Sequence, residues 1–209
     1  QLSGYSFPVH VLINGDTDGA QNVVPALDGS RRVFGAEPVH YAQGCRVLSH
    51  RSTSAAVFPG DVREGDAQRP QSLIDYATEQ MDAAVQCAQK ADVAVVMVGD
   101  LAGLFLTGTV GEGSDTDSLA LPGVQQQLVH RIIDSGTPTI VVITGGRPYT
   151  LGGLERRAAA LVMAFAGGQE GGNGLADVLS GQCEPSGRMP LSQPRSAGAV
   201  PYVYNHHYK

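Results

Sequence analysis

The loop that carries Glu112 is the part of the sequence whose residue types could do chemistry. Glu112 stands between Gly111 and Gly113, and Asp115 follows three residues later. Glycine lets the backbone turn sharply, so a carboxylate with glycine on both sides can extend beyond the ends of the strands toward a neighbouring site. On the residue types alone, however, this pattern favours an ordinary solvated loop acid.

Three glycine-rich stretches could bind a phosphate group instead. They lie at residues 108–113, 145–146 and 167–174, and backbone amides at the start of a helix do bind anions. None of them has the lysine of a P-loop, and none has the spacing of a dinucleotide-binding turn directly after a strand. The sequence also contains no Gly-x-Ser-x-Gly elbow, which disfavours a serine hydrolase. We therefore expect no nucleotide or other cofactor.

Two short patterns could bind a metal ion. Residues 14–19 resemble the beginning of a calcium-binding EF-hand loop, but the twelfth position is Pro25, which cannot supply the bidentate carboxylate. His206 and His207 are neighbours in a tyrosine-rich tail, where adjacent histidines are more often surface residues than ligands. The sequence therefore predicts no metal site.

Composition excludes several classes of partner. The 209 residues are 42% apolar and 16% charged, and they include 27 Gly and 12 Pro, which is typical of a single globular domain rich in loops. The net charge is −6 and no segment is lined by Lys or Arg, so nucleic acid is not an expected partner. The apolar runs, such as residues 93–98, are far too short to span a bilayer, so no membrane partner is expected either.

The cysteines bear on the cellular compartment. Cys45, Cys87 and Cys183 are odd in number and widely spaced, which argues against a disulfide framework. We interpret them as three unpaired thiols. This weakly favours a reducing, cytoplasmic compartment and leaves a secreted or periplasmic location open.

Three apolar, β-rich runs and four helical patterns must position the Glu112 loop. The runs are too short for helices and apolar on both alternations, which predicts strands buried on both faces; they are residues 92–98, 139–143 and 160–164. The helical patterns lie at residues 22–34, 73–88, 122–134 and 172–179.

The order of these elements predicts an α/β fold with a mostly parallel sheet and helices on both faces, an α/β sandwich with flavodoxin-like layering. Ligands of such folds bind at the carboxyl ends of the strands. The segment 99–121, which follows the first run and contains Glu112, is therefore the first place to look for a site. Residues 49–71 are polar and are interpreted as an exposed excursion.

Several separated motifs carry a resemblance to a known family. They are Gly4–Pro8 written Gly-Tyr-Ser-Phe-Pro, Tyr-Ala-Gln-Gly-Cys at 41–45, the loop block at 98–125, Gly-Arg-Pro at 146–148, Gly-Gln-Glu-Gly-Gly at 168–172, Ala-Asp-Val-Leu at 176–179, Pro-Ser-Gly-Arg-Met-Pro at 185–190 and the tail at 200–206. In this order, and over nearly the whole chain, the sequence resembles the C-terminal α/β sandwich domain of family-three glycoside hydrolases, the group of retaining β-glucosidases and β-xylosidases.

The resemblance implies a role for Glu112. In this family a TIM-like barrel supplies an Asp nucleophile, and the sandwich domain lends a loop that carries the general acid/base. Glu112 matches the Glu of the family's Glu-Gly-x-Asp segment, so the acid/base role is carried onto Glu112. Phe105 and Asp115 of the same loop become candidates for substrate binding. No cofactor is implied.

The resemblance also implies a domain organisation. Residues 1–209 are expected to form a single such domain, truncated at both ends and without the catalytic barrel. The chain would be part of an exo-acting retaining β-glycosidase, inactive alone, and its partners would be the barrel-domain polypeptide that carries the nucleophile and a small saccharide or glycoside substrate. A homo-oligomer remains possible. We also expect another chain to cover an edge near the N-terminus, where the family's preceding strand is missing.

Two departures from the family pattern support an alternative, and one of them is Gly153, which stands where the family commonly has Trp. Thr116 follows Asp115 where the family usually has Arg, so the ion pair that is common at this place cannot form. The alternative is a sandwich module that has lost catalysis and serves packing or carbohydrate binding.

Overall fold

The computed structural model describes residues 23–50, 73–103 and 108–199. Five predictions therefore concern residues outside the described part of the chain: the edge near the N-terminus, the turn at residues 14–19, the excursion after residue 50, the position of Phe105, and the surface position of His206 and His207.

A parallel sheet forms the centre of the described structure. Its strands are β3 (Ala94–Gly99), β4 (Thr139–Thr144) and β5 (Ala160–Met163), in the order β3-β4-β5. Both pairs are parallel, with Val96 beside Val141 and Val141 beside Leu161. All three apolar runs thus form strands, which confirms the predicted parallel sheet.

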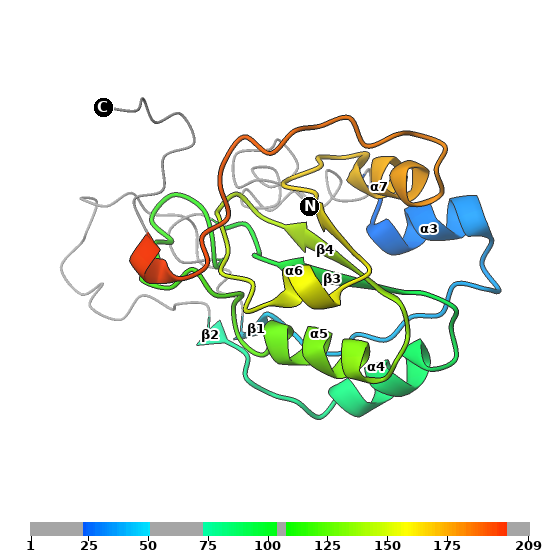
Figure 1. Cartoon of the computed structure of the whole chain (residues 1–209), viewed down its shortest axis with the longest axis horizontal. Coiled ribbons are helices and arrows are strands. Elements are labelled where there is room, and N and C mark those ends of the chain that lie inside the picture. The colour runs from blue at the N-terminus through cyan, green and yellow to red at the C-terminus, as the bar shows by residue number, and fades with distance from the viewer. Residues whose placement is uncertain (1–22, 51–72, 104–107, 200–209) are drawn as a thin grey trace.

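Helices cover both faces of this sheet, as predicted. They are α3 (Ala26–Phe34), α4 (Met81–Ala88), α5 (Gln125–Asp134), α6 (Leu154–Arg157) and α7 (Gly171–Leu179). Figure 1 shows α4 and α5 on one side of the sheet and the pair formed by α3 and α7 on the other. A short antiparallel pair, β1 (Leu48–His50) and β2 (Leu73–Ile74), and a 3-10 turn, η1 (Ala197–Ala199), complete the described elements.

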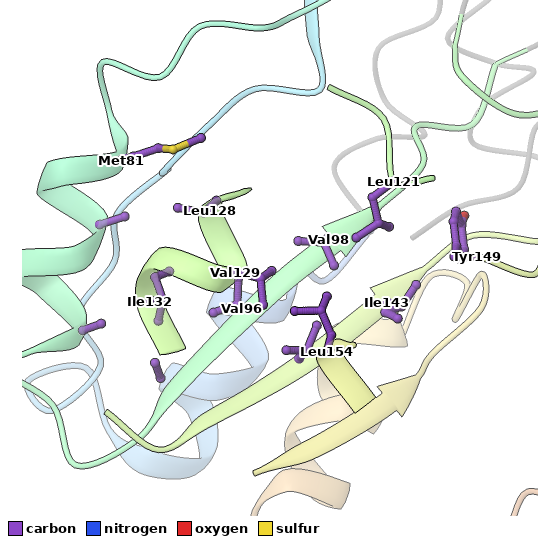
Figure 2. Close-up of a cluster of buried hydrophobic side chains, with 14 residues drawn as sticks. Met81, Val96, Val98, Leu121, Leu128, Val129, Ile132, Ile143, Tyr149 and Leu154 are labelled. Carbon is purple, nitrogen blue, oxygen red and sulfur yellow. The ribbon is translucent and has the colours of Figure 1, made fainter. Parts of the chain in front are cut away.

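The main core lies between the sheet and the helices α4 and α5. Met81 of α4 and Val129 of α5 are fully buried there, together with Val141 of β4. Figure 2 shows these helices turning their apolar side chains toward Val96 and Val98 of β3, with Leu121 and Tyr149 at one end of the cluster. The buried side chains recur every three or four residues along the helices, the spacing of one helix face.

Only the middle strand is buried on both faces, so the prediction was wrong for β3, which has exposed residues on one face, and for β5, which has no fully buried residue. Val142 of β4 is fully buried, whereas its neighbour Met97 is 37% exposed and Val95 is 45% exposed. β3 and β5 are the two edge strands of the described sheet. No other described element covers this face of β3 fully, although both of its alternations are apolar.

The helix predicted at residues 73–88 starts at Met81 instead. Leu73 and Ile74 form the strand β2, and Ile74 is exposed. The Asp75 carboxylate accepts a hydrogen bond from the Ala77 backbone N–H at 2.8 Å. This local turn competes with helical hydrogen bonding, which explains the later start.

Two other helices begin a few residues later than predicted. The helix predicted at residues 122–134 begins at Gln125, and the one predicted at residues 22–34 begins at Ala26. The helix at residues 172–179 is confirmed as α7, but its buried residues are Gly172 and Ala176 rather than the larger apolar residues Leu175, Val178 and Leu179, which are half-buried.

A close contact between α3 and α7 explains why Gly172 is buried. A Cβ atom on Gly29 of α3 would lie 2.1 Å from the carbonyl oxygen of Gly172, and a Cβ atom on Gly172 would lie 2.2 Å from that of Pro25. The Gly172 N–H donates to the Val24 carbonyl oxygen at 3.1 Å. Since backbone meets backbone here, only glycine fits at this crossing.

The described part of the chain contains no helix that is long and apolar enough to cross a membrane.

The cysteines differ in their surroundings, which allows a test of the fold. Cys45 is half-buried against the core, and Cys183 is exposed. Burial, and to a smaller extent the nearby Asp75 carboxylate, raises the pKa of the Cys45 thiol. Less of Cys45 is therefore the reactive thiolate near neutral pH. We expect a thiol reagent to label Cys183 before Cys45, as measured by peptide mass spectrometry over time. Equal labelling rates under native conditions would contradict the described packing, whereas the rates should converge in denaturant.

Candidate functional site

The carboxyl ends of β3 and β4 build the base of the Glu112 loop. β3 ends at Gly99 and is followed directly by Asp100, while β4 ends at Thr144 and is followed by Arg147 and Tyr149. The two strands are parallel, so these residues meet at one edge of the sheet. Ligands of open α/β sheets bind at this edge.

The Asp100 side chain is the centre of a buried polar cluster. It is completely shielded from solvent, and Arg147 is 15% exposed. Its Oδ1 atom accepts a hydrogen bond from the Thr109 hydroxyl at 2.6 Å. Its Oδ2 atom accepts a hydrogen bond from the Tyr149 hydroxyl and lies 3.3 Å from Nε of Arg147. A buried carboxylate needs such partners, because leaving one unpaired costs several kcal/mol.

Thr109 links this cluster to both halves of the loop. Its hydroxyl oxygen accepts a hydrogen bond from the Leu101 N–H at 3.0 Å, and its own N–H donates to the Leu101 carbonyl oxygen at 2.8 Å. Arg147 donates from Nη2 to the Thr109 carbonyl oxygen at 2.7 Å. The Gly103 N–H donates to the Val110 carbonyl oxygen at 2.9 Å. The outgoing and returning backbones of the loop are therefore joined close to β3.

The turn that carries Glu112 is packed against the outgoing backbone. A Cβ atom on Gly111 would lie 2.1 Å from the Gly103 carbonyl oxygen, and Gly111 has φ 134°, a backbone conformation that L side chains rarely adopt. The Ser114 hydroxyl donates to the same Gly103 oxygen at 3.3 Å, and the Ser114 N–H donates to the Gly111 carbonyl oxygen at 3.0 Å. The first of the two glycines beside Glu112 is thus required by a close backbone approach.

The far end of the segment is also tied to β3 and β4. The buried Gln125 side chain accepts a hydrogen bond from the Gly99 N–H and donates to the Gly99 carbonyl oxygen, both at 2.8 Å. The same amide donates to the Pro122 carbonyl oxygen at 2.9 Å. The Thr150 N–H donates to the Leu119 carbonyl oxygen at 2.8 Å. Both ends of the loop are therefore fixed to the edge of the sheet.

Tyr149 serves this cluster as a hydrogen-bond donor. Burial raises the pKa of its phenol far above the ordinary value, and the hydrogen bond to the Asp100 carboxylate and its negative charge raise it further, against a smaller opposite effect of Arg147. The phenol therefore stays protonated at any pH at which the protein is handled. It donates its proton to Asp100 and does not act as a base.

The structure describes two of the three candidate site residues. Glu112 is exposed in the turn, as the glycines on either side led us to expect, and Asp115 is exposed three residues later. Phe105 lies outside the described residues. A carboxylate in the position of Glu112 can exchange a proton with a molecule that reaches this edge of the sheet.

Sequence reasoning missed the cluster beneath Glu112. Asp100, Thr109, Arg147 and Tyr149 were not selected as candidates, although residues 146–148 belong to the quoted motifs. Asp100 directly after one parallel strand, and Arg147 three residues after the end of the next, are the signal that could have indicated this cluster. Within the described ranges, no group of three or more His, Cys, Asp or Glu residues could hold a metal ion.

Comparisons with known proteins agree with the geometry. The family model described as the glycosyl hydrolase family 3 C-terminal domain matches residues 3–209. A periplasmic β-glucosidase of Salmonella typhimurium is 37% identical over 189 residues, which are 90% of this chain and 23% of that protein. A β-xylosidase of Formosa agariphila is 29% identical over 182 residues, which are 87% of this chain and 21% of that protein.

A solved structure is similar to this chain in both fold and sequence. The β-glucosidase of Erythrobacter marinus aligns with 87% of this chain and 24% of its own, with a TM-score of 0.68 and 28% sequence identity. The chain therefore spans less than a quarter of the length of these relatives. The match over residues 3–209 and the shared α/β fold establish that the chain belongs to the C-terminal domain family of the family-three glycoside hydrolases.

Proposed function

We propose that this chain supplies the general acid/base of an exo-acting retaining β-glycosidase, a β-glucosidase or β-xylosidase. The observation that carries the proposal is the exposed position of Glu112 on a turn that the Asp100 cluster ties to the carboxyl edge of the sheet. The names of the relatives, β-glucosidase and β-xylosidase, support the substrate class. The Asp nucleophile comes from a barrel-domain polypeptide that completes the enzyme.

The proposed chemistry needs two carboxyl groups about 5 to 5.5 Å apart. In the first step the barrel Asp attacks the anomeric carbon while Glu112 gives its proton to the leaving oxygen, so the glycosidic bond breaks and a glycosyl-enzyme ester forms. In the second step Glu112 takes a proton from water, whose oxygen attacks the anomeric carbon and releases the Asp. Glu112 is then protonated again, and the configuration at the anomeric carbon is retained.

Two residues of the same loop are proposed to contact the sugar. Asp115 is exposed three residues after Glu112 and can accept hydrogen bonds from sugar hydroxyl groups. Phe105 can offer an apolar ring face to a sugar. No cofactor is needed, because both steps use only carboxyl groups and water.

A non-catalytic module for packing or carbohydrate binding is the second candidate function. The Thr116 hydroxyl, at the place of the family's usual Arg, accepts a hydrogen bond from the Ser118 N–H at 3.2 Å. It therefore makes a local contact and gives Asp115 no cationic neighbour. This candidate predicts that no barrel polypeptide will gain activity from the chain.

The proposal can be tested because this chain supplies only one of the two carboxyl groups that the reaction needs. Glu112 can perform only half of the chemistry, so the chain alone should not hydrolyse aryl β-glucosides or aryl β-xylosides. Adding the barrel-domain polypeptide should restore turnover with retention of configuration, which NMR of the first-formed sugar would show. Hydrolysis by the chain alone, with mass spectrometry showing no contaminating barrel, would contradict the proposal. Failure of every barrel partner to become active would favour the non-catalytic module.

A further inference from the structure

We propose that Asp100 is a positioning residue for Glu112, acting through Thr109, Arg147 and Tyr149. This inference rests on the proposed function, because it concerns how the acid/base is held. The cluster includes Thr109 of the Glu112 loop, which contacts Asp100 through its hydroxyl group and Arg147 through its carbonyl oxygen. It would set the place at which the Glu112 carboxyl group meets the leaving oxygen.

Both oxygen atoms of the buried Asp100 carboxylate have partners. Three groups from two chain segments converge on the two oxygen atoms of Asp100: the hydroxyl of Thr109 from the loop, and the hydroxyl of Tyr149 and the guanidinium group of Arg147 from the segment after β4. The carboxylate is completely shielded from solvent, so water cannot replace a lost donor freely. Loss of one donor from a buried charged group costs more than loss of an ordinary surface hydrogen bond.

The contacts of Asp100 lie close to Glu112 along the chain. Thr109 precedes Glu112 by three residues, and its side chain and backbone are held by Asp100, Leu101 and Arg147. Gly111, directly before Glu112, packs on Gly103 of the outgoing backbone. A shift at Thr109 therefore moves the turn that carries the acid/base.

The position of the Glu112 carboxyl group bears directly on the rate. A carboxyl group that must donate a proton in the transition state works only at hydrogen-bond distance from the leaving oxygen, and a misplacement of about 1 Å can slow a reaction about 100-fold. The cluster also contributes to the stability of the domain, as any buried network does. The measurement must therefore distinguish a displaced Glu112 from a less stable domain.

The test compares three variants in the assembled enzyme, that is, this chain together with its barrel polypeptide. Thr109→Val and Tyr149→Phe each remove one donor to Asp100 and keep the size of the side chain. Thr139→Val is the matched control: Thr139 is buried, its hydroxyl donates to the Thr137 carbonyl oxygen at 2.8 Å, and it begins β4 at the opposite end of the strand. As a further control, Thr109→Ser keeps the hydroxyl and should behave like the parent enzyme.

The readout is the ratio of kcat/KM for a phenyl glycoside to that for a dinitrophenyl glycoside. The first substrate needs protonation of its leaving oxygen and the second needs little. The concentration of correctly folded enzyme cancels in this ratio, so lost stability alone leaves it unchanged. We expect Thr109→Val and Tyr149→Phe to lower the ratio about tenfold or more, in the direction expected for loss of the acid, and Thr139→Val and Thr109→Ser to leave it unchanged.

The outcomes separate this inference from the proposed function. If Glu112→Ala lowers the ratio but Thr109→Val and Tyr149→Phe do not, the positioning role is wrong and the acid/base role stands. If Glu112→Ala leaves the ratio unchanged, the proposed function itself fails.

Hydrogen exchange of the full 209-residue chain, which needs no activity, provides a second measurement. The amides of residues 108–114 should exchange faster in Thr109→Val and Tyr149→Phe than in Thr139→Val at matched global stability. Unchanged exchange in this segment would overturn the positioning role whether or not an active assembly is obtained.

Discussion

Replacement of Glu112 by alanine is expected to slow the assembled enzyme by about 100-fold to 10,000-fold on phenyl glycosides, which is the usual contribution of a general acid. The loss on dinitrophenyl glycosides should be far smaller in the first step, because their leaving group departs without protonation. The measurement is kcat/KM for both substrates, since this constant reports the first irreversible step.

Two further observations make this prediction specific. Azide should restore part of the turnover of Glu112→Ala on the dinitrophenyl glycoside and yield a glycosyl azide, because azide attacks the glycosyl-enzyme without needing a base. Asp117→Ala is the matched control, since Asp117 is an exposed acid in the same segment. An equal loss on both substrates, or an equal effect of Asp117→Ala, would contradict the acid/base role.

Gly172→Ala is expected to destabilise the domain by about 1 to 3 kcal/mol or more, the cost of forcing extra atoms into a packed contact. The new Cβ atom would meet the carbonyl oxygen atoms of Pro25 and Val24 at 2.2 and 2.4 Å. Both are backbone atoms, so α3 would have to move away from α7. Urea-induced unfolding followed by circular dichroism measures this change in the free energy of unfolding.

The same helix offers a control of opposite sign. Gly174 lies two residues further along α7, and a Cβ atom added there would meet no other part of the chain within 4 Å. Gly174→Ala should therefore stabilise the domain by about 0.5 to 1 kcal/mol, because alanine loses less backbone entropy than glycine in a helix. If both substitutions change stability alike, the close crossing of α3 and α7 is not as described.

The strands could be predicted from the sequence because each is a short apolar run between polar segments. What the runs could not indicate was their place in the sheet: β3 and β4 are both apolar on both alternations, yet Met97 is exposed and Val142 is buried. Exposure depends on which elements lie over each strand, and that is decided by contacts far apart in the chain. Before α4, the Asp75 carboxylate forms a local hydrogen bond that favours a turn over helix, and periodicity does not reveal such a bond.

The candidate site was predictable only in part. The glycines beside Glu112 and the family resemblance indicated the exposed carboxyl group. The cluster beneath it joins Asp100 to Tyr149 across 49 residues of sequence, and no local pattern connects the two. Its members are ordinary residue types, so only the parallel pairing of β3 and β4 reveals that they meet.

The double attachment of the Glu112 loop has a consequence for how an enzyme could be assembled from two polypeptides. Residues 100–103 and 108–114 are held by contacts within this chain, so these parts of the loop need not fold against a barrel. Binding that must order a loop loses part of its favourable free energy to that ordering. In the proposed assembly that loss would fall on the folding of the domain, before it meets a barrel, and the affinity between the two would be set by the surfaces around the site.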